Sequence, residues 1–252
     1  MEQYFKELYL TDELHKARAA KARGEYVALC LPLVSSDSGN AQMTDQDMQD
    51  FPYCIEQMED VDASYLDKVR NRLMGKPCEI LRTSDVILRE ITCEDVPFLY
   101  DIYDDDAVRA NMEPLYPELA DEISYTQDYI RCQYGFHDFG MWIMEDIHTH
   151  QVIGRAGLDF LTQENLEKER GNGLLLFSLK EATYGQAEYP IELGFVMGKD
   201  HRGKGLTGQI CQRILAYVQE EMPYASVYAR VRSENRVSIM LLKKLGFFEI
   251  MY

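Results

Sequence analysis

The chain has 252 residues, 46% hydrophobic and 27% charged, so it can bury the core of one large domain or two small ones, and wholesale disorder is excluded. Its formal net charge of -17 repels phosphate backbones and anionic lipid, which argues against nucleic acid and membranes as partners and favours cationic ones. No apolar run reaches the roughly 18 residues of a spanning helix, the first ten residues lack a signal-peptide pattern, and the six cysteines form no C-x-x-C pair, so we expect a cytoplasmic protein with reduced thiols and no metal.

Residues 1–80 carry a first group of predicted elements, a small α/β accessory unit. The continuous apolar run Tyr26–Val34 is typical of a strand buried on both faces. Turn-forming residues at Gly75-Lys76-Pro77 suggest a boundary, so we expect domains at 1–80 and 81–252. The expected elements are a helix over Leu14–Arg23 ending at Gly24, the strand Tyr26–Val34, a loop at Ser35–Asn40, a short strand FPYCI and a helix over Asp62–Met74.

Residues 81–252 alternate strands and helices, with most strands in the second half. An amphipathic stripe of Ile210, Ile214, Leu215 and Val218 supports the longest of the helices. The pattern predicts an α/β chain. The expected elements are strands at VILREI, FGMWIMEDI, QVIGRAGLDF, PIELGFVM, Ser226–Val231 and FFEIMY, helices at Asp95–Ala110, Asp121–Gln133, Leu206–Glu221 and Asn235–Leu245, and an exposed loop or short helix at TQENLEKERGNG.

The strongest chemical signal is a glycine-rich basic loop, Arg202–Gly208, between a strand and a helix. Glycines let backbone N–H groups converge on an anion, the helix N-terminus adds its positive dipole end, and Arg202 and Lys204 supply charge. The alternative is that these glycines only turn the chain between the strand and the helix, but three glycines and two cations directly before a helix favour an anion site. The spacing formally fits the dinucleotide fingerprint of a nicotinamide-dependent oxidoreductase, but the strand ends several residues before Gly203, too early for that tight turn. No Ser or Thr follows a Gly-Lys pair, which excludes a Walker loop.

At this loop the chain resembles the GCN5-related N-acetyltransferases (GNAT), whose R-x-x-G-x-[GA] loop holds the pyrophosphate of coenzyme A. The resemblance covers residues 85–252 through VILREITCEDVPFLYDIY, QVIGRAGL, IELGFVMGKDHRGKGLTGQ and NRVSIMLLKKLGF, and is nearest to the branch that acetylates protein N-termini and small amines. It implies a mixed, mostly antiparallel sheet flanked by helices and acetyl-coenzyme A as cosubstrate. It assigns Phe195, Val196 and Met197 to the pantetheine arm, Arg202, Gly203, Lys204, Gly205, Leu206, Thr207 and Gly208 to the pyrophosphate, and Asn235 to the vicinity of the arm.

Two of these positions have a second interpretation. Thr207 stands where the family has Gly or Ala, and its side chain either crowds the phosphate or adds a hydroxyl donor. Asn235 opens the last helix, where asparagine is also among the best N-cap residues.

The resemblance also implies catalytic residues. Acyl transfer to an amine needs a base, because an alkyl ammonium has a pKa of about 10. Glu192 occupies the position of that base, although a glutamate on a solvent-facing strand or one that only binds the substrate cation is the alternative. The Val196 amide is the expected donor to the carbonyl oxygen. Many relatives protonate the leaving thiolate with a tyrosine where this chain has Leu242, so Ser238 is the remaining candidate donor.

The acceptor side is expected to be acidic, because eight carboxylates face a single Arg109 between residues 101 and 122. They favour a small cationic amine or a peptide N-terminus, although a solvated acidic helix face is an equally good interpretation. His148 and His150 are expected to be turn residues. The charged residues of the cluster are Asp101, Asp104, Asp105, Asp106, Glu113, Glu118, Asp121 and Glu122.

The N-terminal unit resembles the closing part of the haloacid-dehalogenase-like hydrolase fold over residues 10–72, through ARAAKARGEYVALCL and FPYCIEQMEDVDASYLDKV. The nucleophile motif that opens that fold has no counterpart, so phosphatase activity is not implied. An incomplete parallel sheet leaves an edge that another domain or chain must cover, which predicts docking or a homodimer. For the whole chain we expect an acetyl-coenzyme-A-dependent N-acetyltransferase; the alternative is a coenzyme-A-binding module that has lost turnover.

Overall fold

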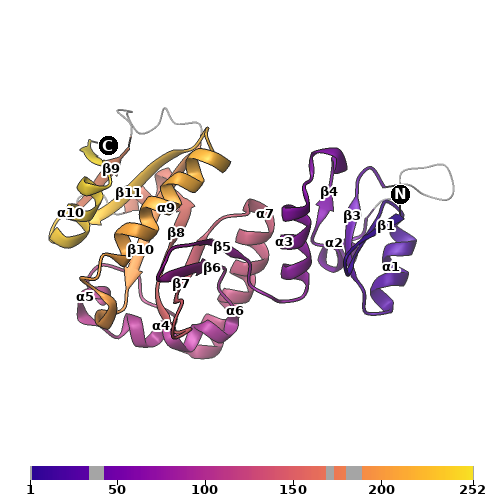
Figure 1. The fold of residues 1–252 in the computed structure, drawn as a ribbon, viewed down its shortest axis with the longest axis horizontal. Coiled ribbons are helices and arrows are strands. Elements are labelled where there is room, and N and C mark those ends of the chain that lie inside the picture. Colours follow the sequence, from indigo (N-terminus) through magenta and orange to yellow (C-terminus); the bar gives the residue numbers. More distant parts are fainter. Residues whose placement is uncertain (1, 34–42, 169–172, 180–188, 252) are drawn as a thin grey trace. The chain divides into compact units, whose positions relative to one another are not determined.

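The computed structural model describes residues 2–33, 43–168, 173–179 and 189–251, so the loop expected at Ser35–Asn40 lies outside the described residues. The chain divides into two compact units, residues 1–78 and 79–252 (Figure 1). Among the helices of the described residues, none has the length and apolar character needed to cross a membrane.

The first unit is a four-stranded sheet with helices on both faces. The strand order is β1-β2-β3-β4, antiparallel between β1 and β2 and parallel for the other two pairs. The elements are β1 (Glu2–Phe5), β2 (Leu8–Thr11), α1 (Leu14–Ala22), β3 (Tyr26–Cys30), α2 (Asp45–Asp50), β4 (Cys54–Ile55), the 3-10 turn η1 (Met58–Asp60) and α3 (Ala63–Leu73).

Alternating residues of β3 belong to different hydrophobic clusters, which explains its continuous apolar sequence. Ala28 and Cys30 pack with Leu66 and Val69 of α3, whereas Val27 and Leu29 pack in the cluster that contains Ala17 of α1 and other residues of that helix. The predicted strand buried on both faces is therefore confirmed, but it ends at Cys30, earlier than the expected run Tyr26–Val34. Helix α1 ends before Gly24, whose φ of 82° is the left-handed conformation typical of a helix C-terminus.

The second unit contains an eight-stranded, mostly antiparallel sheet in the order β12-β9-β11-β10-β8-β7-β6-β5, which confirms the expected fold class. The strands are β5 (Glu79–Arg82), β6 (Val86–Arg89), β7 (Met141–Asp146), β8 (Val152–Phe160), β9 (Leu174–Ser178), β10 (Pro190–Met197), β11 (Ser226–Arg232) and β12 (Phe248–Ile250). The helices are η2 (Cys93–Asp95), α4 (Val96–Tyr103), α5 (Asp106–Arg109), α6 (Leu119–Tyr129), the π-helical η3 (Ile130–Tyr134), α7 (Gly135–His137), α8 (Gln163–Lys168), η4 (Lys199–His201), α9 (Leu206–Glu221) and α10 (Arg236–Lys244).

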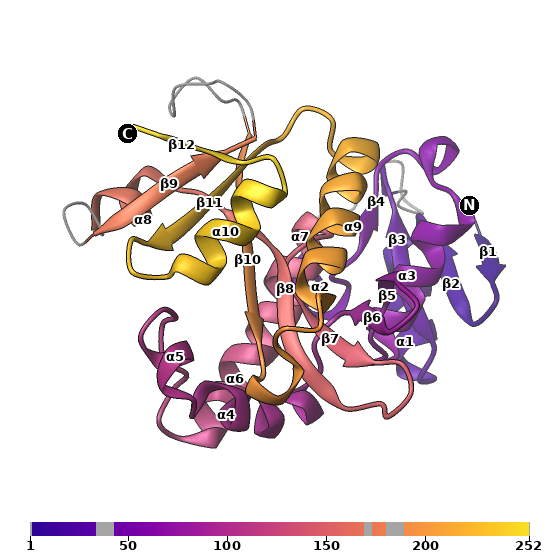
Figure 2. The same cartoon turned by 60° about the vertical axis from the view of Figure 1, so that its left-hand side comes forward.

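Helices cover both faces of this sheet. On one face α9 packs over β8 and β10 (Figure 2). The ring of Tyr217 in α9 meets that of Trp142 in β7 edge-on, at 5.8 Å between centroids. On the other face α4 packs against β8 and α6 packs against α4. Trp142 is fully buried, so its ring anchors the α9 face of the core.

Strand β10 diverges from β11 partway along its length. The parallel pairing with β11 ends at Glu192, opposite Tyr228, whereas the antiparallel pairing with β8 continues to Met197. Figure 2 shows the two strands separating between α9 and α10. The edge of β10 from Phe195 to Met197 therefore has no strand partner on the β11 side.

The prediction of one continuous helix over Asp95–Ala110 is wrong, because the helix is interrupted between Tyr103 and Asp106. Asp105 adopts an extended conformation, and its carboxylate accepts hydrogen bonds from the amides of Ala107 and Val108, so it caps a new short helix, α5. The strands β1, β2, β5 and β9 were not predicted.

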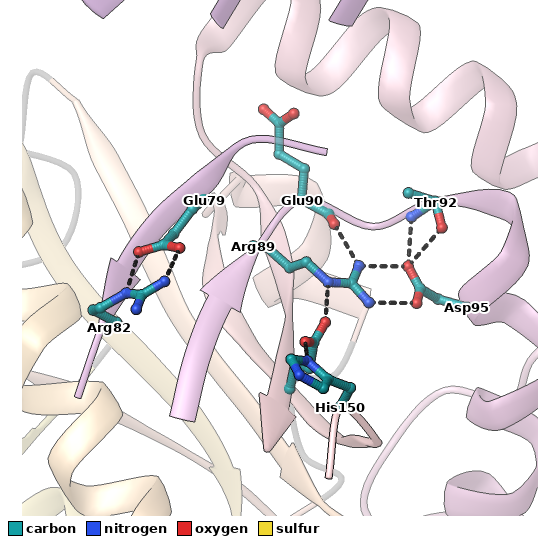
Figure 3. Close-up of polar contacts among 8 residues, drawn as sticks. Glu79, Arg82, Arg89, Glu90, Thr92, Asp95 and His150 are labelled. Atoms are coloured by element: carbon teal, nitrogen blue, oxygen red, sulfur yellow. Dashed lines mark hydrogen bonds and ion pairs between the residues drawn. The ribbon is translucent and has the colours of Figure 1, made fainter. Parts of the chain in front are cut away.

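A buried ion-pair network fixes the connection from β6 to α4 (Figure 3). The guanidinium of Arg89 donates to both carboxylate oxygens of Asp95 at 2.7 and 2.8 Å, and its Nε donates to Glu145 of β7 at 2.6 Å. Asp95 also accepts the amide of Thr92 at 2.7 Å. Because removing one partner of a buried pair leaves the other charge uncompensated, at a cost of about 3–5 kcal/mol, this network holds the helical side of the unit in place.

Candidate active site

A cavity of about 800 Å³ opens where β10 and β11 separate. Its lining includes Glu192 and Phe195 of β10 and Asn235, Ser238 and Leu242 at and within α10. The opposite wall comes from residues between 103 and 129, which include Tyr103 at the end of α4 and three residues of α6, Glu122, Tyr125 and Tyr129. The structure thus places the expected base, the expected thiol-side donor and part of the cofactor strand around one space, whereas the loop Arg202–Gly208 lies outside the lining.

The alternation of strand β10 decides which backbone groups face the opening. Gly198, which directly follows β10, donates its amide to the carbonyl of Ile153 in β8 at 2.9 Å, and alternate residues of a strand direct their backbone groups to the same side. The amide of Val196 therefore faces β8, and that of Phe195 faces the opening. This corrects the expectation that Val196 donates to the carbonyl oxygen, because its amide lies on the paired edge of the strand.

Glu192 forms an ion pair with Arg230 of β11. The Arg230 Nε donates to the carboxylate at 2.8 Å, the Arg230 amide donates to it at 3.3 Å, and the two side chains are 24% and 14% exposed for Arg230 and Glu192 respectively. Burial raises the pKa of Glu192, and Arg230 only partly opposes that effect. A carboxylate with a raised pKa at a cavity wall has the properties of a general base.

Two charged side chains of β8 that the sequence reasoning missed, Arg155 and Asp159, also line the cavity. Asp159 lies directly opposite Glu192 in the β8–β10 ladder, and burial raises its pKa as well. Arg155 lies opposite Val196. The signal was present in QVIGRAGLDF, where Arg155, Gly157 and Asp159 interrupt an apolar strand at every second position and so share one face.

The loop Arg202–Gly208 has the geometry of an anion site. Gly203 and Gly205 have φ values of 75° and 78°, and a Cβ on either would meet no atom within 4 Å, so the backbone is open to a ligand. Helix α9 begins at Leu206, which leaves its first N–H groups without intrahelical acceptors. These groups fit the pyrophosphate of coenzyme A, the cosubstrate that the sequence implies.

Arg202 takes a different role from the one expected. Its Nε donates to the carbonyl of Met197 at 2.9 Å, and its Nη2 pairs with Asp105, the cap of α5, at 3.0 Å. The guanidinium therefore ties the end of β10 to the start of α5, which leaves the exposed Lys204 as the remaining cation of the loop that could bind a phosphate.

The start of α10 shows the local role of Asn235. Its Oδ1 accepts the amide of Ser238 at 3.2 Å, so Asn235 is an N-cap, as one of its two interpretations predicts. Leu242, at the position where many GNAT relatives have a tyrosine, is fully buried at the cavity wall. Ser238 is partly buried and lines the cavity.

The acidic cluster expected on the acceptor side lies mostly away from the cavity. Of its eight carboxylates, only Glu113 and Glu122 line it. Glu122 is 4% exposed and accepts the amide of Tyr116 at 2.8 Å. Among the described residues, no group of three or more potential ligands could hold a metal ion, and His150 pairs with Glu145 instead.

Comparisons with known proteins bear on the second unit. A family model described as an acetyltransferase (GNAT) domain matches residues 85–248. The chain is 27% identical over 177 residues to a Bacillus licheniformis protein named uncharacterized N-acetyltransferase p20, covering 67% of this chain and 82% of that one. Its structure is similar to that of a Bordetella pertussis protein assigned to the GnaT-family acetyltransferases, with a TM-score of 0.51, 17% identity and coverage of 69% and 91%.

Proposed function

The chain belongs to the GNAT acetyltransferases and is an acetyl-coenzyme-A-dependent acyltransferase; on that premise we propose that it acetylates a primary amine, with Glu192 as the base. The observation that carries this proposal is the cavity at the divergence of β10 and β11, where a carboxylate with a raised pKa lies beside an unpaired strand edge. A small amine and a peptide N-terminus both offer the nucleophile that this site can deprotonate.

Residues of the chain would hold the cosubstrate at two places. The N–H groups of Gly203–Gly208 bind the pyrophosphate, and the free edge of Phe195–Met197 binds the pantetheine arm. Acetyl-coenzyme A supplies the acetyl group as a thioester, whose carbonyl carbon is the electrophile. Arg202 keeps the strand end and the loop in register through its bond to Met197.

The protein groups then divide the chemistry. Glu192 accepts the proton of the acceptor ammonium, directly or through water, and Arg230 holds its carboxylate in place. The Phe195 amide donates to the thioester carbonyl oxygen as negative charge develops on it. Ser238 donates a hydrogen bond toward the departing sulfur; since a thiol has a pKa of about 8.5, its thiolate can leave without a stronger acid.

The test is consumption of acetyl-coenzyme A with a panel of polyamines, aminoglycosides, amino acids and short peptides. The thioester should be followed directly, because the exposed Cys54 and Cys132 react with thiol reagents and would add background. We expect at least one class to accelerate consumption, and Glu192→Gln to slow it.

The burial of Leu242 where many relatives have a tyrosine supports the second candidate, a coenzyme-A-binding module without turnover. That module would gain thermal stability with coenzyme A, since a ligand that binds the folded state raises its melting temperature, yet it would consume no thioester with any acceptor.

A further inference from the structure

Arg155 is an unusual residue for the wall of a cavity. Its Nε is buried and has no hydrogen-bond partner, and no carboxylate of the described residues lies within 4 Å of its guanidinium. The groups near the guanidinium are tyrosines: it shares a hydrogen bond with Tyr103, and Tyr129 lies close to it, so none of these neighbours is a carboxylate. Arg155 is partly buried, and taking a guanidinium out of water without a counter-ion is costly, because no partner charge compensates the lost hydration.

Two other arginines of the same lining are paired. Arg230 binds Glu192, and Arg109 pairs with Asp104 and Asp106 at 2.6 Å. Arg155 therefore differs from these two arginines, because it lines the cavity without a carboxylate partner among the described residues. An anionic group on a bound molecule would supply the acceptor oxygens that the folded chain does not.

Two of the four carboxylates of the cavity lie farther along the same strands. Asp159 and Glu192 are direct neighbours across β8 and β10, and Asp159 is four residues from Arg155, about 13 Å between Cα atoms. The positive charge of Arg155 acts on Asp159, but the two side chains form no ion pair. This face of the sheet thus has Arg155 at one end and, at the other, two carboxylates with one arginine, Arg230, which leaves that second end with a net negative charge.

The net charge of the lining also argues against a polycation. Its arginines and carboxylates are equal in number, although the whole chain has a net charge of -17. A site for a polyamine would be expected to share the acidic excess of the chain, whereas this one is balanced. The four arginines are Arg109, Arg155, Arg230 and Arg232, and the four carboxylates are Glu113, Glu122, Asp159 and Glu192.

We propose that the acceptor is a free amino acid, whose carboxylate binds Arg155 and whose amine lies between Asp159 and Glu192. This deepens the proposed function and rests on it. In the reaction Glu192 takes one proton from the ammonium, the amine nitrogen bonds to the acetyl carbon, the C–S bond breaks with its electron pair on sulfur, the second N–H proton passes to that thiolate, and the carboxylate of the amino acid is unchanged. Tyr116 and Tyr125, whose rings are 5.7 Å apart in the cavity wall, favour an apolar or aromatic side chain.

The experiment compares matched acceptors: phenylalanine, leucine and methionine, each as the free acid, the amide and the decarboxylated amine. For the full-length enzyme we expect kcat/KM for the acid to exceed that for the amide by roughly 10- to 100-fold, the range of a charge-assisted hydrogen bond. Arg155→Gln should remove this preference by lowering kcat/KM for the acid while leaving that for the amide within about threefold, and Arg155→Lys should retain part of it. Arg213→Gln, at an exposed arginine of α9 outside the lining, is the matched control.

The outcomes distinguish the amino-acid proposal from the acetyltransferase function on which it rests. If the wild-type enzyme turns over amines or amides as well as the acids, the amino-acid proposal is wrong and the acetyltransferase function stands. If no acceptor consumes acetyl-coenzyme A, the proposed function fails first. The acid-to-amide ratio of the wild type needs no variant, so a failure of Arg155→Gln to fold leaves the test decisive.

Discussion

Replacing Arg230 by glutamine should move the acidic limb of the pH–rate profile to higher pH. A general base works when it is deprotonated, so kcat/KM rises with pH through the pKa of Glu192 and then levels off. Burial raises that pKa and the Arg230 charge lowers it. Without the charge, only the effect of burial remains, and the carboxylate holds its proton to a higher pH.

The size of the shift follows from the geometry. Two unit charges about 4 Å apart interact by about 4 kcal/mol at an effective dielectric constant of about 20, equivalent to about three pKa units at 1.36 kcal/mol each. The N–O distance of 2.8 Å brings the pair within that range, while the 24% exposure of Arg230 admits screening water. We therefore expect the limb to move by about one to two pH units.

The assay is kcat/KM against pH for wild type, Arg230→Gln, Arg230→Lys and Glu192→Gln, with melting temperatures to confirm folding. Arg230→Lys keeps the charge and should shift the limb less. Glu192→Gln should lower kcat/KM by roughly 10²- to 10⁴-fold and abolish the limb. If the limb stays in place in Arg230→Gln, or persists in Glu192→Gln, another group is the base.

Three further changes test the loop, the cap and the first unit. Gly205→Ala forces a side chain into the left-handed region at a cost of about 1–2 kcal/mol, and it should reduce the rise in melting temperature that coenzyme A causes. Gly75→Ala is the control: it has the same backbone strain and an equally open position, and it should leave that rise unchanged. Asn235→Ala should lower the free energy of unfolding by about 1 kcal/mol, and Asn235→Ser should lower it much less, because serine is also a good N-cap. If the stable Ser variant still binds coenzyme A more weakly than the wild type, Asn235 also contacts the cofactor. Hydrogen bonds from Arg18 and Thr44 hold the pKa of Asp47 well below its usual value, so its carboxylate stabilises the fold above about pH 4 and this contribution is lost as the pH falls. In denaturant unfolding, the loss of unfolding free energy caused by Asp47→Asn should therefore shrink from pH 7 toward pH 3. A loss that does not change with pH would contradict this role of Asp47.

The elements that the sequence predicted well are those with strong local signals. The apolar run of β3, the amphipathic stripe of α9 and the asparagine at the start of α10 each depend on neighbours within a few residues. The short strands β5 and β9 were missed because four or five apolar residues suit a strand or a buried helix segment equally well, and their partners are distant in the sequence.

The candidate site shows the same division. Resemblance to a family placed Glu192, Asn235 and Ser238, and the structure brings them to one cavity. The family resemblance did not indicate that Arg230 is the partner of Glu192, 38 residues away, or that Asp105 is the partner of Arg202, 97 residues away. Such pairs form only when the strands and helices are assembled, so no local pattern reports them.

The divergence of β10 from β11 has a consequence for mutational mapping. Since the group that faces the opening at position 195 is a main-chain amide and its side chain lies on the face with α9, alanine scanning cannot remove it. Only an amide-to-ester replacement, which deletes one N–H and leaves every side chain as it is, would expose its share of the catalysis. A survey restricted to side chains would report only the packing of the Phe195 ring against the core and would miss the proposed contribution of its amide.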